Sequence, residues 1–414
     1  MISFERFTLE NGLKVIVHED HSTPYAIVNT LFDVGARDEN IERTGFAHLF
    51  EHLMFGGSKN APKFDEPLEK AGGRSNAFTN NDITNYYDII PAENIETALW
   101  LESDRLLNLN VNQHSLDVQR KVVSEEFKEH YINQPYGDVW HEICKLSYTQ
   151  HPYQWPTIGL NLKHVEDAKL ADVQAFFDKH YVSNNAILVI AGKVKFNEIK
   201  TLVHKWYDDI PMGKPLNRNI KAEPKQTEKR TLTLKRKVPV SAIFKSFHMC
   251  KRSDKNYYAA DLLTDLLAKG QSSRLYQKLV KEKALFSEIN AYVTENLDEG
   301  LILIEGMLLP GTSFKIANQA IEEELALLCN EAISDNELEK IKNQVESTLI
   351  YDEMSAMNKA MNLAFFELLG DADMINHETE LFQAVSKKDL QSQAKEIFTI
   401  ENSNTIYYEG NVNA

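Results

Sequence analysis

The chain has 414 residues, of which 43% are hydrophobic and 26% are charged. This is the composition of an ordered globular protein, and the length exceeds that at which one hydrophobic core stops growing, so we expect at least two domains. The 45 basic and 61 acidic residues give a net charge of -16, which repels nucleic-acid phosphates and anionic membranes and argues against a partner of either kind.

No disulfide framework or membrane anchor is evident in the sequence. The cysteines, Cys144, Cys250 and Cys329, are widely spaced, so we expect buried thiols. No apolar run approaches the roughly 18 residues that span a bilayer, and the first residues lack a basic segment followed by an apolar one. We expect a soluble cytoplasmic protein, or a periplasmic one if a leader has been removed.

The N-terminal half opens with two predicted strands, 13–18 (LKVIVH) and 26–32 (AIVNTLF), which are rich in β-branched and apolar residues. Helices are predicted next, because apolar residues recur at three- and four-residue spacing. These helices cover residues 46–55, 95–106, 116–131 and 169–180. The apolar run 186–191 (AILVIA) then indicates a buried strand that ends at Gly192.

A polar, proline-containing stretch divides the chain at residues 212–230. We place a linker there, between an N-terminal domain at 1–211 and a C-terminal domain at 231–414. The second half repeats the order of the first, with a strand near 238–249, a helix near 258–268, strands at 288–293 and 301–307, and then long helices.

The two halves also end alike. Residues 170–192 (LADVQAFFDKHYVSNNAILVIAG) parallel residues 390–410 (LQSQAKEIFTIENSNTIYYEG), and both predict a helix, an asparagine-containing turn, a closing strand and a glycine. Any helix followed by a strand would show some of this likeness, but the position within each half matches too. The sequence therefore predicts two α+β domains of similar topology.

The stretch 45–55, GFAHLFEHLMF, carries the most chemical information. On an α-helix His48, Glu51 and His52 stand at positions i, i+3 and i+4, so their side chains share one face. Two imidazoles one turn apart can bind one metal ion, and a glutamate beside metal-activated water can act as general base. His-x-x-Glu-His is the zinc motif of inverzincin peptidases. A solvated helix face is the alternative, but the apolar neighbours favour a half-buried helix, where unpaired imidazoles are costly.

A third ligand is expected in the helix 118–130, VQRKVVSEEFKEH. Glu126 follows Val122 and Val123 by four and three residues and is expected to share their inward face, whereas Glu125 and Glu129 point elsewhere. Since a single glutamate in a charged helix is usually solvated, helix geometry favours Glu126 without deciding the choice.

Six segments spread in order over nearly the whole chain carry a family resemblance. They are NGLKVIV from residue 11, TGFAHLFEHLMFGGS at 44–58, GGRSNAFTNNDITNYY at 72–87, LESDRL at 101–106, HPYQWPTIG at 151–159 and SSRLYQKL at 272–279. Together they resemble the M16 metallopeptidases, which include pitrilysin, insulin-degrading enzyme and the mitochondrial processing peptidase. The resemblance implies an α+β fold of two homologous domains, each a mostly antiparallel sheet packed with helices, and one Zn²⁺ per chain.

The resemblance also assigns residues around the metal. The family's distal zinc ligand is the last glutamate of a segment that aligns with QRKVVSEE at 119–126, which implies Glu126. The auxiliary glutamate at the start of that segment is Gln119 here, so a second carboxylate is missing. The segment 75–79 (SNAFT) is implied to be an edge strand that binds the substrate main chain through Asn76, Ala77 and Phe78 by β-augmentation. An ordinary turn into a strand is the alternative.

In complete family active sites the C-terminal domain contributes an arginine and a tyrosine that hold the substrate and support the oxyanion. Val280 and Ser287 occupy these positions in LVKEKALFS at 279–287, and neither can replace them. The resemblance implies a heterodimer in which a homologous subunit supplies the pair. Compensation by Lys281 or Lys283 within the chain, or simply weak activity, is the competing account.

These observations predict a zinc-dependent endopeptidase or oligopeptidase subunit that hydrolyses unfolded peptides with zinc-activated water and Glu51 as general base. The alternative is a non-catalytic core or scaffold subunit of an M16-like complex, and the intact set of ligands and base argues against it. A purely structural zinc protein would need a fourth protein ligand, and the sequence offers no evident one.

Overall fold

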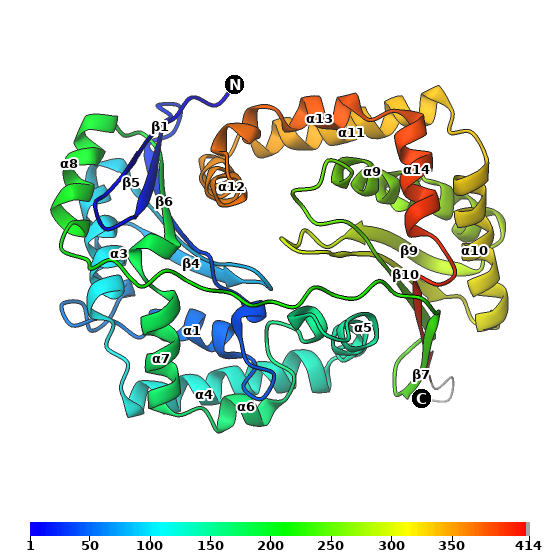
Figure 1. Cartoon of the computed structure of the whole chain (residues 1–414), viewed down its shortest axis with the longest axis horizontal. Coiled ribbons are helices and arrows are strands. Elements are labelled where there is room, and N and C mark those ends of the chain that lie inside the picture. Colours follow the sequence, from blue (N-terminus) through cyan, green and yellow to red (C-terminus); the bar gives the residue numbers. More distant parts are fainter. Residues whose placement is uncertain (411–414) are drawn as a thin grey trace. The chain divides into compact units, whose positions relative to one another are not determined.

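The computed structural model describes residues 1–410 and divides the chain into two compact units, each built on one sheet (Figure 1). Unit 1 contains Met1–Glu129, Trp155–Ile220 and Ile350–His377, and unit 2 contains His130–Gln154, Lys221–Leu349 and the chain from Glu378. One of the passages of the chain between the units is at Ile220–Lys221, within residues 211–227, which form neither helix nor strand. The predicted division of the chain, with domains at 1–211 and 231–414 and a linker at 212–230, remains a prediction.

Unit 1 contains a six-stranded sheet in the order β1-β2-β6-β3-β5-β4. Its strands are β1 (Glu5–Thr8), β2 (Lys14–Glu19), β3 (Tyr25–Phe32), β4 (Arg74–Thr79), β5 (Thr84–Pro91) and β6 (Ala186–Gly192). Strands β2 and β6 are parallel, and all other neighbours in this sheet are antiparallel. Strand β6 is buried along its whole length, because helices pack against both faces of the sheet.

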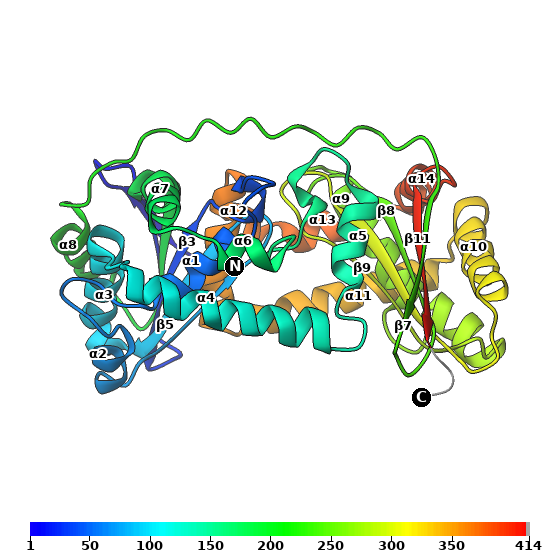
Figure 2. The ribbon, with the colours of Figure 1, turned by 90° about the horizontal axis from the view of Figure 1, so that it is seen from below.

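The helices of unit 1 are α1 (Phe46–Met54), α2 (Asp65–Lys70), α3 (Ile95–Asn108), α4 (Gln113–Phe127), α6 (Leu162–Glu166), α7 (Leu170–His180), α8 (Phe196–Tyr207) and α12 (Ala356–Leu369). Helix α12 packs on β2, β3 and β6. Helices α3 and α8 lie on the opposite side of the sheet (Figure 1). Helix α4 lies against α1 and α6, as both ribbon views show (Figure 2).

Unit 2 contains a five-stranded sheet in the order β7-β11-β8-β10-β9. Its strands are β7 (Arg230–Arg236), β8 (Ala242–His248), β9 (Phe286–Val293), β10 (Leu301–Leu308) and β11 (Ser403–Gly410). The helices that lie or begin in this unit are α5 (Val139–Ser147), α9 (Tyr257–Ala268), α10 (Phe314–Asn330), α11 (Asp335–Asp352), α13 (Glu378–Ala384) and α14 (Lys387–Ile397). Its largest hydrophobic cluster joins α9, α10 and α14 to one face of the sheet.

The two sheets share one topology. From β2 onward the first sheet has the order first, fifth, second, fourth, third strand, and the second sheet has the same order from β7. In each sheet the first strand is parallel to the last and the other neighbours are antiparallel. The predicted fold class is therefore confirmed: two α+β units of similar topology, each a mostly antiparallel sheet packed with helices.

Each sheet is also covered by a helix from the other half of the sequence. Helix α12 buries Ala360, Leu363 and Ala364 against the sheet of unit 1, although it follows most of unit 2 in the chain. Helix α5 buries Val139 and Ile143 against the sheet of unit 2, although it comes from the N-terminal half. The two halves of the chain thus exchange helices, which the sequence did not predict.

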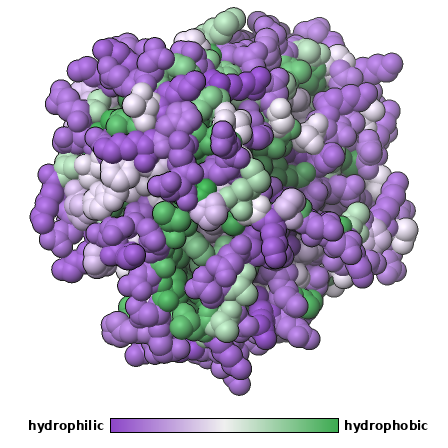
Figure 3. Space-filling view, turned by 60° about the vertical axis from the view of Figure 1, so that its left-hand side comes forward, coloured by the Kyte–Doolittle hydropathy of each residue, from purple (hydrophilic) through white to green (hydrophobic). Residues whose placement is uncertain are grey.

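The face drawn in Figure 3 is mostly hydrophilic, with hydrophobic residues exposed among the hydrophilic ones. Within residues 1–410 no helix combines the length and the apolar character that a membrane crossing requires. Cys144 is buried as expected, whereas Cys250 and Cys329 are half-buried, and all of them are free thiols.

Candidate active site

Helix α1 presents the histidine motif because its other face is apolar and buried. The helix follows Gly45, whose φ of 86° is a left-handed conformation that glycine adopts without strain. Phe50 is fully buried and stacks on the rings of Phe176 and Tyr181, with centroids 5.3 and 5.2 Å away. With the apolar face fixed in this way, His48, Glu51 and His52 remain on the half-buried side of the helix.

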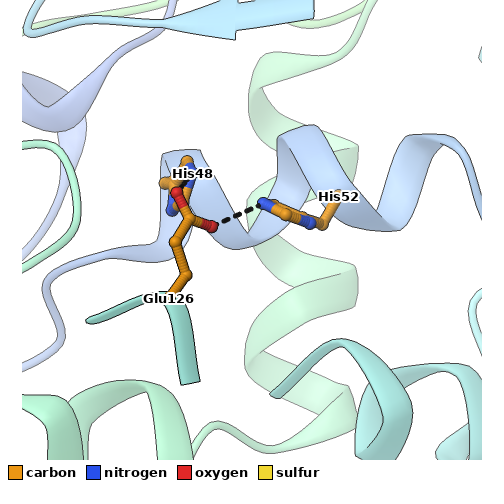
Figure 4. A group of neighbouring side chains, drawn as sticks. All are labelled: His48, His52 and Glu126. Carbon is orange, nitrogen blue, oxygen red and sulfur yellow. Dashed lines mark ion pairs between the residues drawn. The ribbon is translucent and has the colours of Figure 1, made fainter. Parts of the chain in front are cut away.

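The structure brings His48, His52 and Glu126 together, although Glu126 comes from α4 (Figure 4). The Nε2 atom of His48 lies 3.7 Å from Oε1 of Glu126, and Nε2 of His52 lies 3.3 Å from Oε2. Potential ligand atoms of the three side chains all lie within 4.8 Å of one another. In Figure 4 the carboxylate of Glu126 faces both imidazoles.

This arrangement fits a zinc ion. Zinc ligands at about 2.0–2.1 Å in tetrahedral geometry stand roughly 3.3–3.4 Å apart, close to the two separations above. A direct charge-assisted hydrogen bond would be shorter, about 2.7–2.9 Å. Two imidazoles and one carboxylate are also a ligand set of catalytic zinc sites. Among residues 1–410 no fourth histidine, cysteine, aspartate or glutamate joins the cluster, so the protein set is not closed.

The electrostatics favour a neutral His48 imidazole, the form that binds metal. Burial lowers the pKa of His48 to about 4, Glu126 opposes this shift, and His52 adds to it. Burial raises the pKa of the Glu51 carboxyl, whereas Thr79 and His52 act in the opposite direction. The Nδ1 atom of His48 is buried and has no hydrogen-bond partner among the described residues.

A buried charge network, which sequence reasoning did not identify, joins α3 to β5. Arg105 on α3 is ion-paired with Glu102, and the carboxyl of Asp88 on β5 interacts with both side chains. The Arg105 guanidinium lies 4.6 and 4.3 Å from the ring centroids of Phe64 and Tyr86. Burial raises the pKa of Asp88 well above its usual range. In the sequence, Glu102 and Arg105 belong to the segment LESDRL, which was interpreted only as part of the family resemblance.

The predicted substrate strand lies at a sheet edge. Strand β4 carries Asn76, Ala77 and Phe78 and pairs with β5 on one side only, and α1 lies against it. The Ala77 N–H donates to the side chain of the preceding Asn76, 2.9 Å away. Phe78 is 37% exposed. The outer edge of β4 can therefore accept another extended chain.

Of the remaining predicted residues, Gln119 belongs to unit 1, and Val280 and Ser287 belong to unit 2. Gln119 is half-buried on α4, about two turns before Glu126. Val280 packs against the core of unit 2 in the π-helical segment Tyr276–Glu282. Ser287 is exposed on β9, where its hydroxyl donates to the carbonyl of Met307.

Both lysines that could have compensated for Val280 and Ser287 have partners within unit 2. Lys283 is ion-paired with Glu323, at 3.0 Å. The Lys281 ammonium lies 5.8 Å from the ring centroid of Tyr276.

Two family models match the sequence. The model described as Insulinase (Peptidase family M16) matches residues 14–149, and the model described as Peptidase M16 inactive domain matches residues 167–345. The first of these ranges contains Glu51 and all three clustered side chains.

Known proteins similar to this chain cover almost all of it. A protein named zinc protease PqqE from Helicobacter pylori is 28% identical over 413 residues, 97% of this chain and 92% of that protein. A protein named uncharacterized zinc protease YmxG from Bacillus subtilis is 25% identical over 402 residues, 95% of this chain and 96% of that protein.

Solved structures show the same fold. A protease from Helicobacter pylori superposes with a TM-score of 0.94 at 28% identity, covering 99% of this chain and all of the other. Pitrilysin superposes with a TM-score of 0.80 at 18% identity, covering 99% of this chain and 45% of the other, which shows a shared fold alone.

Proposed function

The chain belongs to the M16 family of peptidases, and from this premise we propose that it is a zinc-dependent endopeptidase or oligopeptidase subunit acting on unfolded peptides. The observation that carries the proposal is the meeting of His48, His52 and Glu126, with no fourth protein ligand among residues 1–410. A structural zinc site would be closed by four protein ligands, whereas a catalytic site keeps a position open.

In the proposed reaction the two imidazoles and Glu126 would hold one Zn²⁺, and Glu51 would transfer the proton. When bound, the ion would supply Lewis acidity, which lowers the pKa of water and polarises a peptide carbonyl. Glu51 takes the proton of the attacking water and passes it to the leaving amine nitrogen, so that the amine departs as a neutral group. The shared helix places Glu51 next to His52 and so fixes the base relative to the ligands.

A peptide substrate is proposed to bind as an extra strand along β4. Main-chain hydrogen bonds to an unpaired edge hold any extended peptide without reading its side chains, which suits unfolded substrates. Asn76, Ala77 and Phe78 line the edge next to α1, so this mode of binding would bring the peptide main chain to the helix that carries Glu51.

Substituting Ala77 by proline tests this binding mode. Proline removes the main-chain N–H at residue 77, which bonds only to the neighbouring Asn76 side chain in the substrate-free chain, and proline is tolerated in edge strands. The loss of one hydrogen bond predicts a decrease in kcat/KM of about 3- to 10-fold, mainly through KM. Steady-state kinetics on an unstructured peptide measure it, with Ala77→Ser, which keeps the N–H, as the control. Equal kinetics of both variants would contradict strand addition.

We further propose that a homologous subunit completes the site. Val280 and Ser287 offer no cationic or phenolic donor for a developing oxyanion, and one relative, from Arabidopsis thaliana, is named probable mitochondrial-processing peptidase subunit beta. The removal of one oxyanion donor typically costs about 100- to 1,000-fold in kcat, so the chain alone should be slow.

Assays of the purified chain, alone and mixed with the product of a neighbouring homologous gene, test this account. We expect hydrolysis of an unfolded peptide to rise at least 100-fold in the mixture. Full activity of the isolated chain would reject the two-subunit arrangement while supporting the peptidase assignment. Absence of activity in the zinc-loaded mixture would reject the assignment itself.

A non-catalytic scaffold is the rival proposal, and one observation favours it: the second family model is described as an inactive domain. That model covers residues 167–345, however, whereas the proposed ligands and base all lie within residues 14–149. The description therefore concerns the half of the chain for which no catalytic role is proposed.

A further inference from the structure

The N-terminus of α1 is held by the carboxylate of Glu39, a residue six positions before Gly45. Oε2 of Glu39 accepts the N–H of Gly45 at 2.9 Å, and Oε1 accepts the N–H of Ala47 at 2.7 Å. The first N–H groups of a helix have no partner within the helix, and Gly45 has no side chain to cap them. Helix α1 also has no acidic residue in its first turn, so the Glu39 carboxyl provides the hydrogen-bond acceptors from outside the helix.

Glu39 is itself almost fully buried, with 9% of its surface exposed. Burial raises the pKa of this carboxyl to about 8, and the N–H groups of Ala47 and Gly45 counter the shift. Both oxygens accept N–H donors, and these contacts favour the ionised form of the carboxyl against the effect of burial.

Buried ion pairs hold the short 3₁₀ helix Ala36–Asp38, which immediately precedes Glu39. Arg37 pairs with Asp82 at 3.1 Å, and both side chains are buried. Arg218 pairs with Asp38 at 2.6 Å, and the Trp155 indole donates to the Ala36 carbonyl. Glu39 is thus presented to α1 from a fixed support.

A second set of contacts restrains the chain on entry to α1. The Thr44 hydroxyl accepts the N–H of Leu160 at 2.7 Å and lies 2.9 Å from Nδ1 of His164. A Cβ atom at residue 45 would come within 2.7 Å of the carbonyl oxygen of Ile158, so only glycine fits there. The start of the helix is therefore held by the carboxylate and by residues 158–164 together.

We propose that Glu39 is a positioning residue for the metal centre, whose carboxylate sets the rotation and axial position of α1 and so directs both imidazoles toward Glu126. Ala47, which Glu39 contacts, is directly followed by His48 in the chain. Metal and catalytic constellations tolerate displacements of only about 0.5 Å, so a small rotation of α1 matters. The inference rests on the proposed metal site and adds a residue that touches neither metal nor substrate.

The test compares Glu39→Gln with a matched control, Glu223→Gln. Glutamine has one acceptor oxygen, and its amide NH₂ would face one of the two N–H donors. Glu223 in unit 2 is also a buried carboxylate that accepts backbone N–H groups outside any helix, those of Thr149, Gln150 and His151. Both substitutions replace a carboxylate that accepts backbone N–H groups, but only Glu39→Gln changes a contact of α1.

Metal binding is the readout, measured by titrating the full-length apoprotein with Co²⁺ and recording its visible absorption. For Glu39→Gln we expect Co²⁺ affinity to fall about 10-fold or more and the absorption bands to change, as for other residues that orient metal ligands. Glu223→Gln should keep the affinity and spectrum of the wild type even though its Tm falls. Glu39→Asp, which restores a carboxylate, should recover part of the affinity.

The same titration distinguishes failure of the positioning role from failure of the proposed metal site. Wild-type affinity and an unchanged spectrum in Glu39→Gln would overturn the positioning role, however far its Tm falls. If that variant does not fold, Glu39→Asp decides, and wild-type binding by this shortened carboxylate would overturn the role equally. A wild-type chain that binds no Co²⁺ would reject the proposed metal site and this inference with it. Peptidase activity does not enter the readout.

Discussion

Replacing Glu51 by glutamine is expected to abolish measurable peptide hydrolysis while leaving the metal in place. Glutamine has nearly the same size and keeps the polar contacts of its surroundings, but it cannot accept the proton of the attacking water. General-base catalysis typically contributes about 100- to 10,000-fold, so kcat should fall by that factor with little change in KM. Metal content should stay at one ion per chain, because Glu51 is not among the three clustered ligands.

The measurement is kcat beside zinc content, on wild type, Glu51→Gln and a control. Glu42→Gln is a suitable control, because Glu42 is an exposed glutamate just before the same helix. Undiminished hydrolysis by Glu51→Gln would refute the general-base role. Loss of zinc together with activity would instead make Glu51 part of the metal's binding site.

Replacing Glu126 by glutamine is expected to release the metal. The substitution removes the anionic ligand and leaves two imidazoles, so zinc affinity should fall by more than the roughly 10- to 100-fold that changes around a ligand cost. Hydrolysis should fall in parallel and recover in part at high zinc concentration. Zinc that remains bound after dialysis against a weak chelator measures the effect.

The neighbouring glutamate provides the control for this substitution. Glu125 is 74% exposed at its side chain and pairs with Lys128 on the outer surface of α4. Glu125→Gln should therefore keep wild-type zinc affinity. The opposite pattern, with zinc lost from Glu125→Gln and kept by Glu126→Gln, would move the ligand by one residue and contradict the observed geometry.

Local patterning predicted the elements that set the site, because those elements depend on local contacts. The spacing of His48, Glu51 and His52 among apolar residues predicted a helix at 46–55, and α1 spans Phe46–Met54. The apolar runs at 13–18 and 26–32 predicted strands that became β2 and β3, with bounds shifted by one residue. The duplicated ends of the two halves predicted the shared topology.

Sequence periodicity did not predict which elements pack together when they are far apart in the chain. Nothing in the periodicity of α12 or α5 tells which sheet each one covers, since an apolar face packs equally well on any complementary one. Both helices cover the sheet of the other half of the chain. Strand β1 was also missed, since it is short and largely exposed, and short strands of this kind carry little apolar signal.

Helix geometry alone did not identify the third proposed ligand. Val122 was expected to face inward, but it is 44% exposed, whereas Val123 is fully buried. Glu126 lies at the border of the buried face, where it can reach the imidazoles of α1. The family resemblance, rather than periodicity, distinguished it from Glu125 and Glu129.

Glu39 had no signal in the sequence at all. Its partners are main-chain N–H groups of Gly45 and Ala47, which carry no side-chain identity that a pattern could reveal. Residues that support a site through the backbone are recognisable only once the chain is folded. The same limit applies to Arg105 and Asp88, whose side chains interact only across α3 and β5.

The most direct test is the position of zinc in crystals of the zinc-loaded protein, measured by anomalous scattering on either side of the zinc absorption edge. The account predicts one peak per chain, bounded by Nε2 of His48, Nε2 of His52 and a carboxylate oxygen of Glu126, with solvent as the remaining ligand. A peak elsewhere, or a fourth protein side chain bound to the ion, would contradict it.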